Sequence, residues 1–285
     1  MVSKGEQQQG RTGKRRLIVH VGVQKTGSTS IQRHLGRNAK ALSDRLVVRT
    51  PDEGTPMRPL GRAAVNFSLR SESGDAEAAL KIALDDVLDT LPANDLPVLL
   101  SHENLAGAMP GNGGETRLYP ALPQIVSLIR GHAKDFDTDF VYYSRRMNAW
   151  KSSVWAQAVR TDGYTRREEE FMLETAELPG WGDLHRRLVE AVGGKRVTRF
   201  KLEDEPEAER PGRQLLLHAG LSDAEIDALQ PLEGPSMSRL NDASTEFLRH
   251  LNSLNINPHA RGKVADLVVR TQSLFNADHR PEGTL

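Results

Sequence analysis

The sequence predicts an α/β protein of three layers, in which helices cover both sides of a central parallel sheet. Short apolar runs rich in β-branched residues alternate with helical segments, which is the pattern of a parallel sheet with right-handed crossovers. A chain of 285 residues with 38% hydrophobic residues suits one large α/β domain with a full core. Polar clusters follow several of the strands, at the edge where such sheets place their chemistry.

Elements can be assigned along the chain in this order. The expected strands are 17–21, 46–49, 98–101, 140–143 and 197–200. The expected helices are 75–91, 122–132, 166–177 and 183–192, followed by a helical C-terminal part with helices at 242–254 and 261–275. Residues 16–276 are expected to form the folded domain, between a polar, disordered tail at 1–15 and a flexible tail at 277–285.

The loop after the first strand has the residues of an anion site. The apolar run ends at Gly22, and small hydroxyl residues then lead into a helix. Free backbone amides, the helix dipole and the ammonium group of Lys25 converge there, so the loop is predicted to bind a phosphate or sulfate group. The residues predicted to bind it are Gln24, Lys25, Thr26, Gly27, Ser28, Thr29 and Ser30.

The place of the lysine separates this loop from two common nucleotide-binding loops. In the Walker A pattern the lysine follows the last glycine, whereas Lys25 precedes Gly27. The dinucleotide fingerprint cannot be read from Gly22 and Gly27 alone. The stretch Q-K-T-G-S-T-S instead resembles the 5′-phosphosulfate loop of the sulfotransferases that use 3′-phosphoadenosine 5′-phosphosulfate (PAPS). That loop reads K-[ST]-G-[ST]-[TS], often with proline where this chain has Gln24.

A second strand–turn–helix segment carries the other half of the resemblance. Arg145 stands at the end of the fourth strand, and Ser153 follows about two helical turns later. The resemblance implies that these two residues hold the 3′-phosphate of the nucleotide, a dianion that suits a guanidinium fork. A one-residue slip in the alignment would choose Arg146 and Ser152 instead. Met147 stands where the family usually has proline.

A third segment, after the strand 98–101, holds two candidate bases. It resembles the family's segment that carries the catalytic base, which is histidine in some members and glutamate in others. This chain has both, as adjacent His102 and Glu103. Adjacent residues leaving a strand point to opposite faces, so only one is expected to enter the cleft. Histidine is favoured because imidazole titrates near neutrality.

A fourth segment resembles the family's W…Y-E-D region, which closes over the adenine. Trp181 precedes a helix, and Leu202-Glu203-Asp204 follows the last strand. Leu202 stands where the family usually has an aromatic residue, and Phe200 is the neighbouring aromatic candidate for stacking. Phe200 and Leu202 are therefore the predicted adenine contacts.

The composition limits which kinds of partner the chain is expected to bind. Lysine plus arginine and aspartate plus glutamate number 38 each, so no large basic field predicts a nucleic-acid partner. The chain has no cysteine, and its nine histidines are scattered, so we expect no metal site. No apolar run is long enough for a membrane span. A cytoplasmic bacterial enzyme is expected.

The resemblance implies a P-loop NTPase-like topology and transfer of a sulfuryl group from PAPS to a hydroxyl or amine. The acceptor would be a carbohydrate or another small molecule, bound by variable loops expected at 50–74 and 106–117. The loop 106–117, with several glycines, has the composition of a mobile lid. Lys25 would stabilise the leaving 5′-phosphate. Two alternatives stay open, a P-loop-type nucleotide kinase and a non-catalytic nucleotide-binding module.

Overall fold

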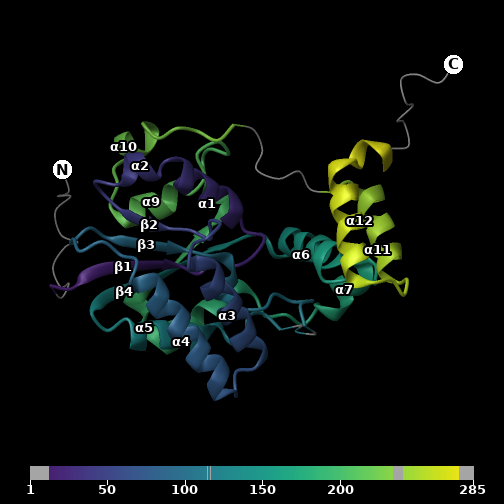
Figure 1. Cartoon of the computed structure of the whole chain (residues 1–285), viewed down its shortest axis with the longest axis horizontal. Coiled ribbons are helices and arrows are strands. Elements are labelled where there is room, and N and C mark those ends of the chain that lie inside the picture. The colour runs from purple at the N-terminus through teal and green to yellow at the C-terminus, as the bar shows by residue number, and fades with distance from the viewer. Residues whose placement is uncertain (1–12, 114, 116, 234–239, 276–285) are drawn as a thin grey trace.

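Five strands form one sheet, and every pair of neighbouring strands in it is parallel (Figure 1). The computed structural model describes residues 13–113, 115, 117–233 and 240–275. The order of the strands across the sheet is β2-β3-β1-β4-β5. Their bounds are β1 Arg15–His20, β2 Val47–Arg49, β3 Val98–Ser101, β4 Phe136–Ser144 and β5 Val197–Lys201. Strand β1 lies between β3 and β4 and is parallel to both. The segments that follow these three strands therefore leave the sheet side by side, at the carboxyl ends of the strands.

Both faces of the sheet are covered, as its alternating side chains require. Leu17 and Val19 of β1 belong to one buried hydrophobic cluster, whereas Ile18 between them belongs to a second cluster on the other face. A strand with both faces buried reads as a continuous apolar run, which is why β1 was recognisable from its sequence.

Helices form the two outer layers. On one face lie α1 Ser28–Arg37, α2 Ala39–Leu42, α9 Arg213–Ala219 and α10 Asp223–Asp227 (Figure 1). On the other lie α3 Met57–Leu69, α4 Gly74–Leu88, α5 Leu122–His132 and α8 Trp181–Val192. The predicted three-layer α/β/α class with a central parallel sheet is confirmed.

The C-terminal part is helical and packs at one end of the molecule (Figure 1). It consists of α11 Asp242–Asn252, α12 Pro258–Arg270 and the 3-10 helix η4 Gln272–Phe275. It packs against α6 Met147–Thr161, which α7 Glu168–Glu174 follows along the chain. Asn252 Nδ2 and Arg261 Nη2 both donate to the carbonyl oxygen of Val159, at 2.8 and 2.9 Å, and so tie this part to α6. The remaining 3-10 helices are η1 Glu103–Ala106, η2 Gly194–Arg196 and η3 Leu202–Asp204.

One expected loop is wrong. The stretch 50–74 contains the helix α3, whose buried Met57, Leu60, Ala64 and Phe67 recur at helical spacing. Pro59 and Gly61 disguised this periodicity, although Pro59 lies in the first turn of the helix, where proline is tolerated. Strand β1 already begins at Arg15, and residues 1–12 and 276–285 of the expected tails lie outside the described residues.

Candidate active site

A cavity of about 820 Å³ lies where the segments after β1, β3 and β4 meet. This is the position at which open parallel sheets bind ligands. Ten of the residues predicted from the sequence line it. They are Gln24, Lys25, Gly27, Ser28, Thr29, Ser30, Glu103, Arg145, Ser153 and Leu202.

The loop after β1 is sharply turned by left-handed residues. Gly22, Val23, Lys25 and Gly27 have φ angles of 74°, 62°, 68° and 88°. A left-handed residue other than glycine costs roughly 1–2 kcal/mol, and such strain persists only where surrounding contacts impose it. Thr26 is one such contact, since its buried hydroxyl donates to the carbonyl oxygen of Val23 at 2.6 Å. Thr26 is therefore a support beneath the loop rather than part of the cavity lining.

The N-terminus of α1 opens into the cavity. Ser28, Thr29 and Ser30 form its first turn and line the cavity, and the first helical hydrogen bond is donated by Ile31 to Gly27. The amides of the three residues before Ile31 therefore lack partners within the helix, and the first turn holds no acidic residue. This end of α1 is suited to an anion.

Glu103 is locked against the same loop. A Cβ atom added at Gly22 would clash with the backbone of Glu103, so only glycine lets the two segments cross this closely. Gln32 of α1 donates from Nε2 to Glu103 Oε2 at 2.8 Å. Glu103 therefore has a fixed place beside the N-terminal part of α1.

Of the two adjacent candidate bases, the structure places Glu103 in the cavity wall and His102 behind it. His102 is buried, and its ring lies where a Cβ atom at Gly61 of α3 would have to sit. Its Nδ1 atom lies 3.2 Å from the amide nitrogen of Asn104. His102 thus begins η1 and packs α3 against the end of β3.

The ionisation of Glu103 is set by its neighbours. Burial raises the pKa of the carboxyl group, but hydrogen bonds from His102 and Gln32 and charge on His102 outweigh burial and lower it to about 2. The hydrogen bond from His102 is donated by a protonated Nδ1 atom, which lies 3.4 Å from Glu103 Oε2. Glu103 is a carboxylate at neutral pH.

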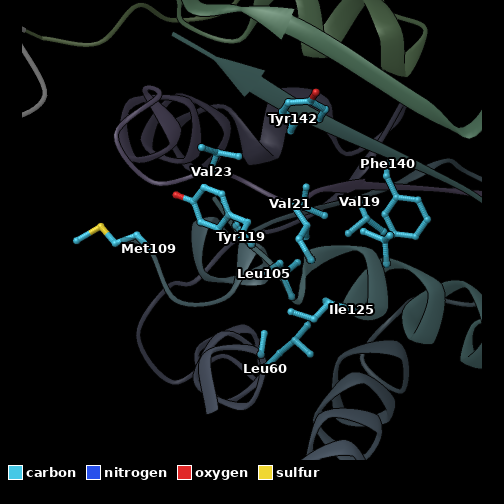
Figure 2. Close-up of a cluster of buried hydrophobic side chains, with 14 of the residues drawn as sticks. Val19, Val21, Val23, Leu60, Leu105, Met109, Tyr119, Ile125, Phe140 and Tyr142 are labelled. Carbon is cyan, nitrogen blue, oxygen red and sulfur yellow. The ribbon is translucent and has the colours of Figure 1, made fainter. Parts of the chain in front are cut away.

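Gln24 joins the loop to the segment after η1. Its side chain accepts from the hydroxyl of Tyr119 at 2.7 Å and donates to the carbonyl oxygen of Gly107 at 2.9 Å. Figure 2 shows Tyr119 beside Val23 in the buried cluster, with Met109 at its edge. A proline at position 24, which the resemblance would favour, could make neither side-chain bond.

Arg145 and Ser153 line the cavity, whereas Arg146 and Ser152 do not. Two indole groups hold this side in place. Trp150 Nε1 donates to the carbonyl oxygen of Gln24 at 2.9 Å, and Trp181 Nε1 donates to that of Arg145 at 2.6 Å. The two rings meet edge to face with centroids 5.0 Å apart. The backbones of the two predicted phosphate-binding segments are therefore tied together through one aromatic pair.

The two predicted adenine contacts, Leu202 and Phe200, lie in different places. Leu202 lines the cavity, and its Cδ1 atom lies 2.9 Å from where a Cβ atom on Gly27 would stand. Phe200 is not in the lining, because it packs on the second buried cluster against Tyr143 and His218, with centroids 5.5 and 6.0 Å away.

Sequence reasoning missed one whole side of the cavity. Arg62, Val65, Asn66 and Leu69 of α3 line it, spaced as one stripe of a helix. Gln157 and Thr161 come from α6, and Gln157 Oε1 accepts from Lys25 Nζ at 3.4 Å. The hydrophobic spacing of α3 was the available signal. The expected loop 106–117 contributes Gly107, Met109 and Asn112, and its residues 114 and 116 lie outside the described residues.

The described residues show neither a cluster of metal ligands nor a helix that could span a membrane. Within the described ranges, histidine and acidic side chains form no group of three or more that could hold a metal ion. None of the helices in that part of the chain is long and apolar enough to cross a membrane.

Comparison with known proteins gives a likeness in structure rather than in sequence. No family model matches the chain, and no curated protein matches it. Among solved structures, a sulfotransferase from Alicyclobacillus acidocaldarius is similar with a TM-score of 0.46 and 14% sequence identity. The likeness covers 93% of this chain and 97% of that one.

Proposed function

We propose that the chain is a sulfotransferase that moves a sulfuryl group from PAPS to a hydroxyl or amine of a small-molecule or carbohydrate acceptor, releasing 3′-phosphoadenosine 5′-phosphate (PAP). One observation carries the proposal. The loop with Lys25, the pair Arg145 and Ser153, and the carboxylate of Glu103 line the same cavity. This arrangement supports the proposal, because a donor with phosphate groups at both ends needs two anion sites and an acceptor hydroxyl needs a base.

Each group has a role in the proposed transfer. The acceptor oxygen forms a bond to sulfur while the bond from sulfur to the bridging oxygen of the 5′-phosphosulfate breaks, in line and through a loose transition state. Negative charge then grows on the departing phosphate, where the Lys25 ammonium and the amides at the start of α1 stabilise it. Glu103 takes the proton of the acceptor hydroxyl. Arg145 and Ser153 hold the 3′-phosphate.

The preference for Glu103 over His102 as the base rests on placement. Glu103 lines the cavity and is ionised at neutral pH, so it can accept a proton. His102 is buried behind it against α3. Of the two, Glu103 is the group that a bound acceptor could reach, and geometry comes before basicity in choosing a general base.

The direct test is transfer of radiolabelled sulfate from PAPS to a broad acceptor panel, with Lys25→Ala as the key variant. We expect kcat to fall about 10²–10³-fold in Lys25→Ala with a much smaller change in PAP affinity, because the ammonium acts mainly on charge that develops during transfer. Lys40→Ala, at an exposed position of α2, is the matched control and should behave as the wild type.

Two outcomes would contradict the proposal. Near-normal turnover in Lys25→Ala would rule out the proposed stabilisation of the leaving phosphate by Lys25. Mg²⁺-dependent ATP hydrolysis or phosphoryl transfer, with no sulfate transfer from PAPS, would show a nucleotide kinase instead.

A further inference from the structure

The side of the cavity formed by α3 has a chemical character of its own. Arg62, Val65, Asn66 and Leu69 lie at positions i, i+3, i+4 and i+7, so one stripe of the helix faces the cavity. The stripe presents a guanidinium group, an amide and two aliphatic side chains. We call these four residues the α3 wall.

Glu103 separates the α3 wall from the phosphate-binding loop. On one side, its backbone crosses Gly22 too closely for any side chain there. On the other side, the preceding residue His102 packs directly on Gly61, the neighbour of Arg62. A hydroxyl group that gives its proton to Glu103 is therefore at the boundary, and the body of its molecule extends toward α3 rather than toward the donor.

Arg62 is an exposed cation in the lining of the cavity. Within the described ranges, no hydrogen bond or ion pair joins its side chain to another residue. Arg58, one turn earlier on the same helix, donates from Nε to the carbonyl oxygen of Pro51 at 2.9 Å. The carboxyl groups of Glu103 and Asp162 line the same cavity, but neither is bonded to Arg62. An arginine that lines a cavity without a fixed partner is suited to a carboxylate, phosphate or sulfate group of a ligand.

The rest of the α3 wall restricts the ligand further. Val65 and Leu69, with Met109 from the segment after η1, give this side of the cavity apolar surface. No aromatic side chain is among the described residues that line the cavity, so there is no ring platform for stacking a flat group. The surface fits an aliphatic or edge-packed body that ends in a charged group.

We propose that the acceptor is a hydroxyl compound with an apolar body and an anionic group, and that Arg62 binds this group. The inference rests on the proposed function for the identity of the reaction, but the binding preference stands apart from it. Val65 and Leu69 pack on the body, and Asn66 is available to hydrogen-bond at its edge. Arg62 acts here as a specificity-determining residue.

The test compares acids with their neutral amides. The probes are para-hydroxyphenylacetate against para-hydroxyphenylacetamide, and omega-hydroxylaurate against omega-hydroxylauramide. Binding is measured by calorimetry without nucleotide, and sulfate transfer from PAPS is measured separately. In the wild type we expect the acid of at least one pair to bind about tenfold more tightly than its amide, as for a charge-assisted contact at an accessible site.

Three variants locate the effect. Arg62→Gln should bring the acid and the amide within about twofold of each other, and Arg62→Lys should keep part of the preference. Arg58→Gln removes the same charge from the same helix outside the cavity and should leave the preference unchanged. The KM for PAPS should be unaffected in all three variants.

Several results would overturn the inference. They are equal binding of acid and amide by the wild type in both pairs, an equal loss for acid and amide in Arg62→Gln, and a raised KM for PAPS in Arg62→Gln, which would assign Arg62 to the donor. If the acid preference is present and depends on Arg62 but no sulfate is transferred to any acceptor, the proposed function fails and the anionic subsite remains.

Discussion

The two sides of the cavity are built in different ways. The side with Lys25, Arg145 and Ser153 binds the donor in the proposed function, and we call it the donor wall. It depends on backbone conformation and on part-buried hydrogen bonds between distant segments. The α3 wall depends on which face of a helix is turned inward by packing on His102. A wall made of backbone tolerates few changes, whereas a wall made of side chains on a fixed helix can be altered one residue at a time. The first suits a constant ligand and the second a variable one.

The sharpest test of this division is at Glu103, where the two walls meet. We expect Glu103→Gln to lower kcat about 10²–10⁴-fold, because it removes the proton acceptor but keeps an oxygen for Gln32. His102→Asn should lower stability and change kcat far less. The measurement is kcat with a saturating acceptor, together with unfolding in urea.

The pH dependence of activity separates the same two residues. Because the pKa of Glu103 is lowered to about 2, its carboxylate remains ionised well below neutrality. We therefore expect no loss of kcat/KM from this group between roughly pH 5 and 8, whereas imidazole bases ordinarily give an acid limb near pH ~6.5. If such a limb were observed and were abolished in His102→Asn, His102 rather than Glu103 would be the base.

Glycine substitutions should break the two walls to different degrees. Gly22→Ala places a Cβ atom on the backbone of Glu103 at a φ of 74°, so we expect a loss of about 3–5 kcal/mol in the free energy of unfolding. Gly61→Ala meets only the His102 ring, and a loss of about 1–3 kcal/mol is expected.

The control for this pair is Gly262→Ala, in the middle of α12 with open space around the new atom. It should stabilise the protein by roughly 0.5–1 kcal/mol, as removal of a helical glycine does. Urea unfolding at neutral pH gives all three values. Tolerance of Gly22→Ala would mean that the donor wall is as adaptable as the α3 wall.

Acid sensitivity should come from beneath the donor wall. His20, at the end of β1, is fully buried, and its Nδ1 atom lies 2.8 Å from Ser101 Oγ. Burial lowers the pKa of His20 to about 4, against the opposing effect of the Glu103 charge. Its contribution to stability is therefore complete above pH ~6.5 and is lost as the pH falls toward 4, amounting to about 2 kcal/mol by pH 5.

Unfolding free energies between about pH 7 and 5 check this prediction, with His20→Asn as the variant whose slope should flatten. The pH range in which Glu103 loses its contribution to stability lies lower than that of His20. Since its pKa is lowered from 4.5 to about 2, its own contribution is present above pH 4.5 and is lost only below that. An unchanged slope in His20→Asn would exclude His20 as the source.

The smallest expected effect concerns the link between the two sides. Gln24→Leu and Tyr119→Phe each remove one partner of the 2.7 Å bond between the donor loop and the segment after η1. A double-mutant cycle on unfolding free energy should give a coupling of about 1 kcal/mol. A cycle between Gln24→Leu and Gly262→Ala, whose sites are not in contact, should give none. A coupling near zero in the first cycle would mean that the bond does not join the two sides energetically.

Features that depend on the local sequence could be predicted, whereas features that depend on packing between distant segments could not. All five strands and the loop 24–30 were found because local signals mark them: apolar runs, glycines at turns, and hydroxyl residues at a helix start. Local signals could not place Phe200 on the far face of β5 or His102 behind the cavity, since both depend on packing against α9 and α3. The helix α3 itself was missed because a proline and a glycine interrupt its pattern.

The paired indole groups of Trp150 and Trp181 also make the protein its own optical probe. The chain has three tryptophans. The third, Trp155, follows Trp150 in α6, and its Nε1 atom donates to the carbonyl oxygen of Arg166. Two of the three indole groups, those of Trp150 and Trp181, therefore emit beside residues proposed to hold the nucleotide. A shift of the Gln24 or Arg145 backbone would alter the hydrogen bond of an indole, so fluorescence can follow occupancy of the donor wall without a label.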